Sequence, residues 1–156
     1  MQNNQITNSR NTKFLGLTIE ETLSWKCHIN HILSRLSSVC YAVKIITPLM
    51  SEDTSKMIYS WYVHSITTHS IIFRGNSPHS IDISKIKKWI IQFMTKWSRD
   101  SCRLLFRRLE ILPLQSQYIF SVLLFVVKNK VLYTTNQEIH NITTRSNTNL
   151  HPPVCN

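Results

Sequence analysis

Apolar residues recur at intervals of three and four over most of this chain, which is the spacing of one face of an α-helix. The longest series consists of Trp25, Ile29, Ile32, Leu33, Leu36, Val39, Cys40, Val43 and Ile46. Pro48 ends this first predicted helix, because the residue before a proline is pushed out of the helical region. The pattern therefore opens with one long amphipathic helix.

A second and a third helix follow with the same periodicity. Ser51 suits the N-cap of the second, with Glu52 and Asp53 in its first turn. Its inward stripe is predicted to be Met57, Ile58, Trp61, Tyr62 and Ile66. Gly75 breaks this helix, and Ser77 or Ser80 can cap the third. The apolar face of the third helix is predicted to be Ile83, Ile86, Trp89, Ile90, Phe93 and Trp97.

Two more helices complete the predicted set. Asp100 or Ser101 caps a short fourth helix with apolar residues Leu104, Leu105 and Leu109. Pro113, as a first-turn proline, starts a fifth helix that is apolar on nearly all sides from Tyr118 to Val127. A helix of that kind belongs at the centre of a bundle.

The two ends of the chain differ from this helical middle. Residues 13–19 alternate enough to predict a short strand or half of a hairpin. Residues 1–12 are expected to be a flexible lead-in, and the Asn/Thr-rich residues 133–156 an extended or disordered tail. The fold class is therefore mainly α, with a short N-terminal strand or hairpin and about five helices within residues 13–132.

Composition narrows the class of protein. A length of 156 residues with 42% hydrophobic residues is enough for one folded domain. Only two glycines are present, and no phosphate-cradling or dinucleotide-binding glycine motif occurs, which argues against ATPases and dehydrogenases. The run Tyr118 to Val127 is about half the ~20 residues that span a bilayer, so no membrane span is expected. The polar N-terminus is no signal peptide.

The cysteines and the charge point to an intracellular protein with a polyanionic partner. Four scattered cysteines without a secretion signal are expected to be free thiols in the nucleus or cytoplasm, not in a secreted protein. The net charge of +10 and the pI of about 9.8 favour nucleic acid or an acidic membrane surface.

The positive charge is concentrated in one segment. Eight of the eighteen Lys and Arg residues lie between positions 85 and 108, against the single acid Asp100. Most fall opposite the core stripe of the third helix or on one face of the fourth, where they suit a phosphate backbone. The candidate nucleic-acid-binding residues are Lys85, Lys88, Lys96, Arg99, Arg103, Arg107 and Arg108. The alternative is a solvated helix face, and the spacing of Trp89 and Trp97 favours core packing over base stacking.

Catalytic and metal sites find little support in the residues. Cys27 and His31 are one turn apart, but no second ligand pair follows to complete a zinc site. The only adjacent acids are Glu20-Glu21 and Glu52-Asp53, and adjacent acids on a helix point away from each other. We therefore expect no catalytic residue, no metal site and no cofactor.

Several short motifs resemble one protein family. The chain opens with a turn of the form F-L-G at Phe14-Leu15-Gly16, followed by Leu23-Ser24-Trp25-Lys26 and His28-Ile29. Later segments are Gly75-Asn76-Ser77, Arg99-Asp100-Ser101-Cys102-Arg103, Leu105-Phe106, Leu112-Pro113-Leu114, Ile139-His140 and Thr144-Arg145. In this order and spacing they resemble the region that follows the catalytic palm in reverse transcriptases of jockey-like, LINE-type non-LTR retrotransposons.

The resemblance implies a primer grip at Phe14, Leu15 and Gly16, followed by a thumb-like helical domain. It also implies that the partner is an RNA–DNA hybrid or an RNA, which is bound without sequence specificity. It further implies a palm domain, which is missing here. The family's Tyr-x-Asp-Asp motif, through which the parent enzyme uses Mg²⁺, lies well upstream of the F-L-G turn. We therefore expect a catalytically incomplete fragment of an RNA-directed DNA polymerase.

The chain departs from the family pattern at several positions. His69-Ser70 and Arg74 stand where tyrosine-glycine and tryptophan are usual, and Ile142 stands where an aromatic residue is usual. Loss of a packed aromatic side chain at position 74 would leave a cavity that lowers the free energy of unfolding by ~3–5 kcal/mol. Two alternatives remain open: an independent basic helical module that contacts an acidic protein or membrane surface, and a chain that does not fold stably without its palm.

Overall fold

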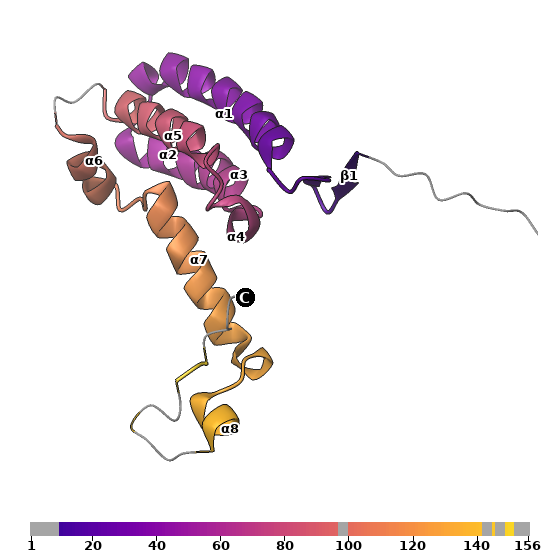
Figure 1. The fold of residues 1–156 in the computed structure, drawn as a ribbon. Helices are drawn as coiled ribbons and strands as arrows, with labels where there is room; N and C mark the ends of the chain where they lie inside the picture. The colour runs from indigo at the N-terminus through magenta and orange to yellow at the C-terminus, as the bar shows by residue number, and fades with distance from the viewer. Residues whose placement is uncertain (1–9, 97–99, 142–144, 146–148, 152–156) are drawn as a thin grey trace, which may run out of the picture. The chain divides into compact units, whose positions relative to one another are not determined.

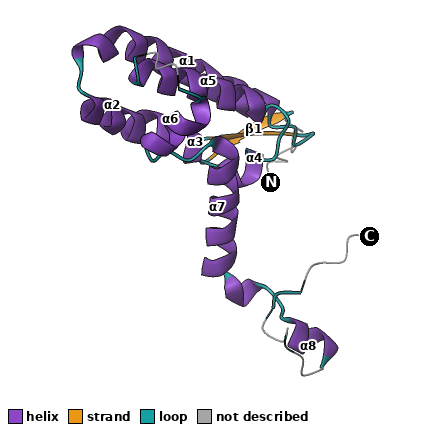
Figure 2. Cartoon of the chain, turned by 90° about the vertical axis from the view of Figure 1, so that its left-hand side faces the viewer, coloured by secondary structure: helices purple, strands orange, loops and turns teal. Residues whose placement is uncertain are grey.

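The computed structural model describes residues 10–96, 100–141, 145 and 149–151 of the chain. Within these residues the fold is mainly helical with a short antiparallel hairpin at its N-terminal end, as the sequence predicts (Figure 1, Figure 2). The chain forms two compact units, Met1–Ile119 and Phe120–Asn156. The first unit holds the hairpin and most of the helices.

The hairpin consists of β1 (Asn11–Phe14) and β2 (Leu17–Glu20), paired so that Phe14 lies opposite Leu17. Its first strand begins inside the segment that was expected to be a lead-in. Leu15 and Gly16 form the two-residue turn with φ of 46° and 79°. Two positive φ values match a type I′ turn, which suits the twist of a hairpin. Glycine adopts this conformation freely, whereas Leu15 is strained in it.

The first helix agrees closely with its prediction. Helix α1 (Lys26–Ile46) buries Ile29, Ile32, Leu36, Cys40 and Val43, all members of the predicted stripe. A 3₁₀ turn (Thr47–Leu49) that contains Pro48 follows it, so the helix ends where the proline predicts.

Glu20 joins the hairpin to α1. Trp25, at the N-cap, has a left-handed backbone (φ 61°) and its side chain makes no capping bond. The Glu20 carboxylate instead accepts hydrogen bonds from the amides of Lys26 (3.2 Å) and Cys27 (2.9 Å) and from the Ser24 hydroxyl. Hydrogen bonds from the Cys27 thiol, Ser24 and the Cys27 amide lower the pKa of Glu20 from 4.5 to about 2. The first acid of the Glu20-Glu21 pair thus has a structural role.

The second predicted helix is broken into pieces. Ser51 caps α2 (Glu52–Ile58) as expected, its hydroxyl accepting from the Thr54 amide at 3.3 Å. A π-helical segment, Tyr59–His64, continues α2 and is followed by α3 (Ser65–Thr68) and α4 (Ile71–Arg74).

The predicted inward stripe of this second helix is largely wrong. Trp61 is 74% exposed, and Met57 and Tyr62 are also exposed, whereas Tyr59 and Val63 form part of the core. Ile66 is buried as predicted, and Ile58 packs against the core. A π-helical turn contains more residues than an α-helical turn, so a period of 3.6 misplaces Trp61 and Tyr62 within the segment Tyr59–His64.

Helix α5 (Ser80–Met94) is the central helix of the first unit and contacts α1, α2 and α6. Ile83 and Ile90 are fully buried, as predicted, but Trp89 is 55% exposed. His79 occupies the N-cap, and its side chain makes no capping bond. The two serines expected there are used elsewhere: the hydroxyl of Ser77 donates to the Ser24 carbonyl at 3.3 Å, and that of Ser80 to the Arg74 carbonyl at 2.7 Å. Trp97 lies outside the described residues.

Helix α6 (Cys102–Arg108) is capped by Ser101, one of the two predicted residues. Leu105 and Leu109 are buried as expected, whereas Leu104 is exposed. Helix α7 (Leu114–Lys128) begins directly after Pro113, whose carbonyl accepts from the Gln117 amide at 2.9 Å.

Arg74 occupies the position where the sequence predicted a cavity. Its side chain is fully buried, and the guanidinium Nη2 donates to the Thr67 carbonyl at 2.7 Å. The next residue, Gly75, lies directly under the Tyr118 ring: a Cβ at this position would come within 2.2 Å of the ring. The long arginine side chain thus fills space, at the expense of burying a cation.

The second unit contains the later part of α7, a 3₁₀ turn (Lys130–Leu132) and α8 (Asn136–His140). A capping box between Thr135 and Glu138 starts α8, so part of the tail that was expected to be extended is helical. The expectation that α7 is a central helix of the bundle stays a prediction, because most of its apolar run belongs to the second unit. The exposed apolar residues of α7 are Ile119, Phe120, Leu123, Leu124, Phe125 and Val127.

The capping role of Glu20 predicts the effect of Glu20→Gln. The pKa of Glu20 is lowered to about 2 in the folded chain. The ionised carboxylate therefore stabilises the folded state fully above about pH 4.5, and this stabilisation is lost as the pH falls toward 2. We expect the variant to melt a few degrees lower at pH 7 and together with the wild type near pH 2, as followed by circular dichroism. Glu21→Gln is the control and should melt like the wild type; equal loss in both variants would contradict the capping role.

Candidate nucleic-acid interface

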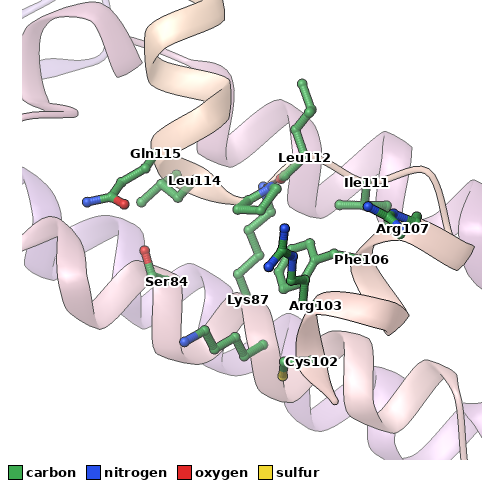
Figure 3. A pocket seen from close by; sticks show the side chains of 12 residues that line it. Ser84, Lys87, Cys102, Arg103, Phe106, Arg107, Ile111, Leu112, Leu114 and Gln115 are labelled. Carbon is green, nitrogen blue, oxygen red and sulfur yellow. Dashed lines mark hydrogen bonds between the residues drawn. The ribbon is translucent and has the colours of Figure 1, made fainter. Parts of the chain in front are cut away.

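A cleft of about 600 Å³ lies between α5, α6 and the start of α7 in the first unit (Figure 3). Three of the seven predicted cations, Lys88, Arg103 and Arg107, line it. We call it the cationic cleft. Its remaining lining residues are Ser84, Lys87, Cys102, Phe106, Ile111, Leu112, Pro113, Leu114 and Gln115.

Helical spacing brings these cations together. Arg103 and Arg107 are four residues apart on α6 and share one face, as predicted. Lys88 reaches the same cleft from α5. All three side chains are exposed, and no carboxylate lines the cleft among the described residues. Several cations around a concave surface that holds no carboxylate focus a positive potential into it.

The other four predicted cations do not join the cleft. Lys85 forms an ion pair with Asp82 (2.8 Å), and Arg108 forms one with Glu52 on α2 (2.6 Å). Lys96 is exposed beyond the end of α5, beside Lys44 at a different pocket. Arg99 lies outside the described residues.

Lys87, which the predicted cationic set omits, forms the floor of the cleft. Its side chain is 1% exposed, and Figure 3 shows it extending toward Leu112. The ammonium donates to the Leu112 carbonyl at 2.7 Å and to Oε1 of Gln117 at 2.8 Å. It also lies 5.9 Å from the centre of the Tyr59 ring. Burial lowers the pKa of Lys87 from 10.5 to about 8.

A series of polar contacts extends from the buried Lys87 through Gln117 to His64, which is exposed at the surface. Nε2 of Gln117 lies 3.3 Å from Nδ1 of His64. Partial burial, together with the nearby charge of Lys87, lowers the pKa of His64. The series therefore connects α5, α7 and the π-helical segment. A signal for it exists in the sequence, because Lys87 falls between Ile83 and Ile90 on the predicted apolar stripe.

Aromatic residues line a second surface, between α1 and α5. Trp89, which the sequence places in the core, lines a groove of about 260 Å³ between α1 and α5. Tyr41 and Phe93 line the same groove, and the Lys44 ammonium lies 5.8 Å from the centre of the Phe93 ring. Aromatic faces near cations are suited to stacking with nucleic-acid bases.

The hairpin turn exposes apolar side chains. Phe14 is 60% exposed and Leu15 is 76% exposed, with Gly16 beside them at the tip. Nε2 of His69 lies 3.2 Å from the Leu15 carbonyl and holds the turn against the helices. The primer-grip assignment of these three residues stays a prediction.

Cys27 and His31, the pair considered for zinc, do not complete a metal site in the part of the chain that the structure describes. No group of three or more His, Cys, Asp or Glu residues within it could hold a metal ion. The thiol of Cys27 is hydrogen-bonded to Glu20, and this contact raises the pKa of the thiol. Cys40 and Cys102 are likewise free, and Cys155 lies outside the described residues.

One helical segment, Lys26–Leu49, is long and apolar enough to cross a membrane by length and composition. A helix that contributes a stripe to a protein core meets the same criterion, and α1 has such a buried stripe.

Comparisons with known proteins add no family to these observations. No protein-family model, curated protein or solved structure matches the chain.

The buried ammonium of Lys87 predicts a specific pH dependence of stability. Its pKa is about 8 in the folded chain against 10.5 ordinarily, so unfolding takes up a proton between these values and stability rises with pH. Relative to Lys87→Met, the wild type should gain up to about 3 kcal/mol of unfolding free energy over this range. Urea unfolding at several pH values measures it.

Lys88→Met is the matched control for this measurement. Lys88 is adjacent in sequence but exposed, so its replacement should leave the pH dependence of the wild type in place. If the unfolding free energies of the wild type and of Lys87→Met change with pH in parallel, the ammonium is not desolvated in the folded chain.

Proposed function

We propose that this chain is a catalytically incomplete fragment of a non-LTR retrotransposon reverse transcriptase that binds nucleic acid without sequence specificity. The observation that carries the binding proposal is the cationic cleft, where Lys88, Arg103 and Arg107 converge without a carboxylate in the described lining. The origin rests on the motif resemblance. A mainly helical fold with the F-L-G residues at a hairpin turn is compatible with that origin.

The chemistry of the cleft fits a phosphate backbone. Arginine can grip phosphate oxygens with two parallel hydrogen bonds, whereas lysine acts as a point charge. Two arginines one helical turn apart, with a lysine from a neighbouring helix, can contact successive phosphates. Such contacts position the nucleic acid and carry no sequence information. An RNA–DNA hybrid or RNA is therefore the expected partner.

The groove lined by Tyr41, Trp89 and Phe93 supplies a second type of contact with the nucleic acid. Trp89 follows Lys88 on α5 but faces the groove between α1 and α5, so a strand must pass around α5 to contact both the cleft and the exposed indole. Stacking on an aromatic ring tolerates every base and adds ~1–3 kcal/mol per base. The combination of cations and an exposed tryptophan favours single-stranded or frayed ends of the partner.

Three of the eight acids of the chain have structural roles. Two-metal phosphoryl transfer needs carboxylates that hold divalent cations ~3.5–4 Å apart. In the described residues Glu20 caps α1, Glu52 pairs with Arg108, and Asp82 pairs with Lys85. We propose that polymerase activity, which needs Mg²⁺ in the parent family, would require a palm domain supplied separately.

Neutralising the cleft provides the main test. The triple variant Lys88→Gln, Arg103→Gln, Arg107→Gln should bind a short RNA–DNA hybrid more weakly. The slope of log affinity against log salt should become shallower by about 2–3, because each phosphate contact contributes ~0.7–0.9. Fluorescence anisotropy with a labelled hybrid at several salt concentrations measures both quantities.

The matched control neutralises three exposed lysines outside the cleft: Lys26, Lys128 and Lys130. It removes the same charge and should keep most of the affinity. Equal loss in both triple variants would mean that net charge alone drives binding. Absence of binding by the wild type at low salt would overturn the proposed function.

Stacking has a separate test in Trp89→Ala. We expect the affinity for single-stranded RNA to fall by at least about 1 kcal/mol, because the exposed indole is replaced by a methyl group. The salt slope should stay as in the wild type, because no charge is removed. The same anisotropy titrations measure this, and an unchanged affinity would exclude stacking on Trp89.

A further inference from the structure

A second cavity of the first unit, about 340 Å³ in volume, is lined by donors and potential cations. The polar lining residues His28, His31 and Arg35 come from α1, and His69 follows α3. Its remaining lining residues are Gly16, Ile32, Ser65 and Ile66. We call it the histidine pocket. No carboxylate lines it among the described residues.

His28 is the buried polar group of this pocket. Its side chain is 2% exposed, and Nδ1 accepts a hydrogen bond from the Thr18 amide of β2 at 3.4 Å. An accepting Nδ1 places the proton of the neutral ring on Nε2, which is therefore a donor. Nε2 is buried and has no hydrogen-bond partner among the described residues. A buried donor without a partner costs about 1–3 kcal/mol, which a ligand acceptor would recover.

Arg74 adds positive charge directly behind the pocket. Its Nη2 donates to the carbonyls of His69 (3.4 Å) and Ile66 (3.5 Å), two lining residues. The guanidinium is fully buried, and Nε and Nη1 have no partner in the described structure. A buried cation without a counter-ion is costly. An anion in the adjacent pocket would reduce this electrostatic cost.

The other lining residues complete a set suited to an anion. Arg35 can offer two parallel N–H groups to one phosphate. Nε2 of His69 lies 3.2 Å from the Leu15 carbonyl, a contact that orients the ring. The hydroxyl of Ser65 is already used, because it donates to the Trp61 carbonyl at 2.6 Å. Gly16 allows the turn to approach, since a Cβ there would lie 3.2 Å from Nε2 of His69.

We propose that the histidine pocket binds a single phosphate group, held by Arg35 and by the rings of His28, His31 and His69. The phosphate can be inorganic or the terminal group of a nucleotide. This inference does not depend on the proposed function, because the cationic cleft shares no residue with the pocket.

Binding should strengthen as the pH falls. Burial lowers the pKa of His28, and the charges of Arg74, His69 and His31 lower it further, so the free ring is neutral near pH 7. Those three groups and Arg35 are the titratable or charged residues that surround His28, while β2 contributes the Thr18 amide. A bound anion favours the protonated form of His28, whose Nδ1 then gives up the hydrogen bond from the Thr18 amide, and it therefore raises the pKa of this ring.

The test uses sulfate, whose charge is constant over the working range, and inorganic phosphate as probes. Histidine ring signals in nuclear magnetic resonance spectra report both the affinity and the ring pKa values. From about pH 7.5 to about pH 5.5 the affinity for sulfate should rise roughly tenfold or more, and saturating sulfate should raise the pKa of His28. No saturable shift of the His28 signal would overturn the proposal.

Two variants make the test specific. Arg35→Gln should lose the sulfate-dependent shift of His28, while Arg103→Gln in the cationic cleft should keep it. His31→Gln serves as a second pocket variant if Arg35→Gln melts early by circular dichroism. Equal sulfate affinity in the wild type and both pocket variants would overturn the proposal.

A comparison of ligands identifies the source of the phosphate. Tighter binding of a 5′-phosphorylated dinucleotide than of inorganic phosphate would support a nucleotide end, and equal binding would support free phosphate. An unphosphorylated dinucleotide should not shift His28, and a shift as large as with the phosphorylated one would overturn the proposal. The cleft triple variant should keep phosphate binding, so the failure of one site is distinguishable from that of the other.

Discussion

The buried ammonium of Lys87 is the contact on which the arrangement of the first unit depends. It joins α5 to the carbonyl of Leu112 and to the side chain of Gln117, and so fixes where α7 begins relative to α5. A lysine can make three hydrogen bonds, and two of them here hold segments 25 and 30 residues away in sequence. The cationic cleft exists because this contact holds the α6–α7 connection beside α5. An apolar residue at this position could pack, but it could not satisfy Leu112 and Gln117.

The chain has more cationic than acidic residues, and this excess accounts for two sites in the first unit that are lined by cations. The chain has eighteen Lys and Arg residues against eight acids. Several of those acids have structural partners: Glu20 caps α1, Glu52 pairs with Arg108 and Lys56, and Asp82 pairs with Lys85. No carboxylate is then left among the described residues that line either the cationic cleft or the histidine pocket. We propose that both surfaces accept an external anion, which would reduce the repulsion between the cations that line each of them.

The sequence predicts well those features that local interactions decide. Helix α1 with its buried stripe, the caps at Ser51 and Ser101, and the hairpin all depend on neighbours within a few residues. It fails where a distant contact overrides the local pattern. A π-helical turn moves the face of the second helix. Lys87 and Arg74, both cations, are buried because backbone carbonyls from other segments accept their hydrogen bonds. For the candidate interface, helical spacing correctly brought Arg103 and Arg107 together. The pair of Lys85 with Asp82 is three residues apart and could have been read from the sequence, whereas the pair of Arg108 with Glu52 joins distant segments and could not.

The hairpin turn shows how these constraints bear on origin. Leu15 is unfavourable at this position for two reasons. Its backbone has a left-handed φ of 46°, and its apolar side chain is exposed to water. Asparagine at this position would relieve both, so local stability does not explain Leu15. Strain that the surrounding structure maintains is typical of a contact site, and His69 holds the Leu15 carbonyl in place. Positive φ also occurs at Leu23 and Trp25, so the conformation of Leu15 alone does not identify a contact site, and the primer-grip assignment stays a prediction.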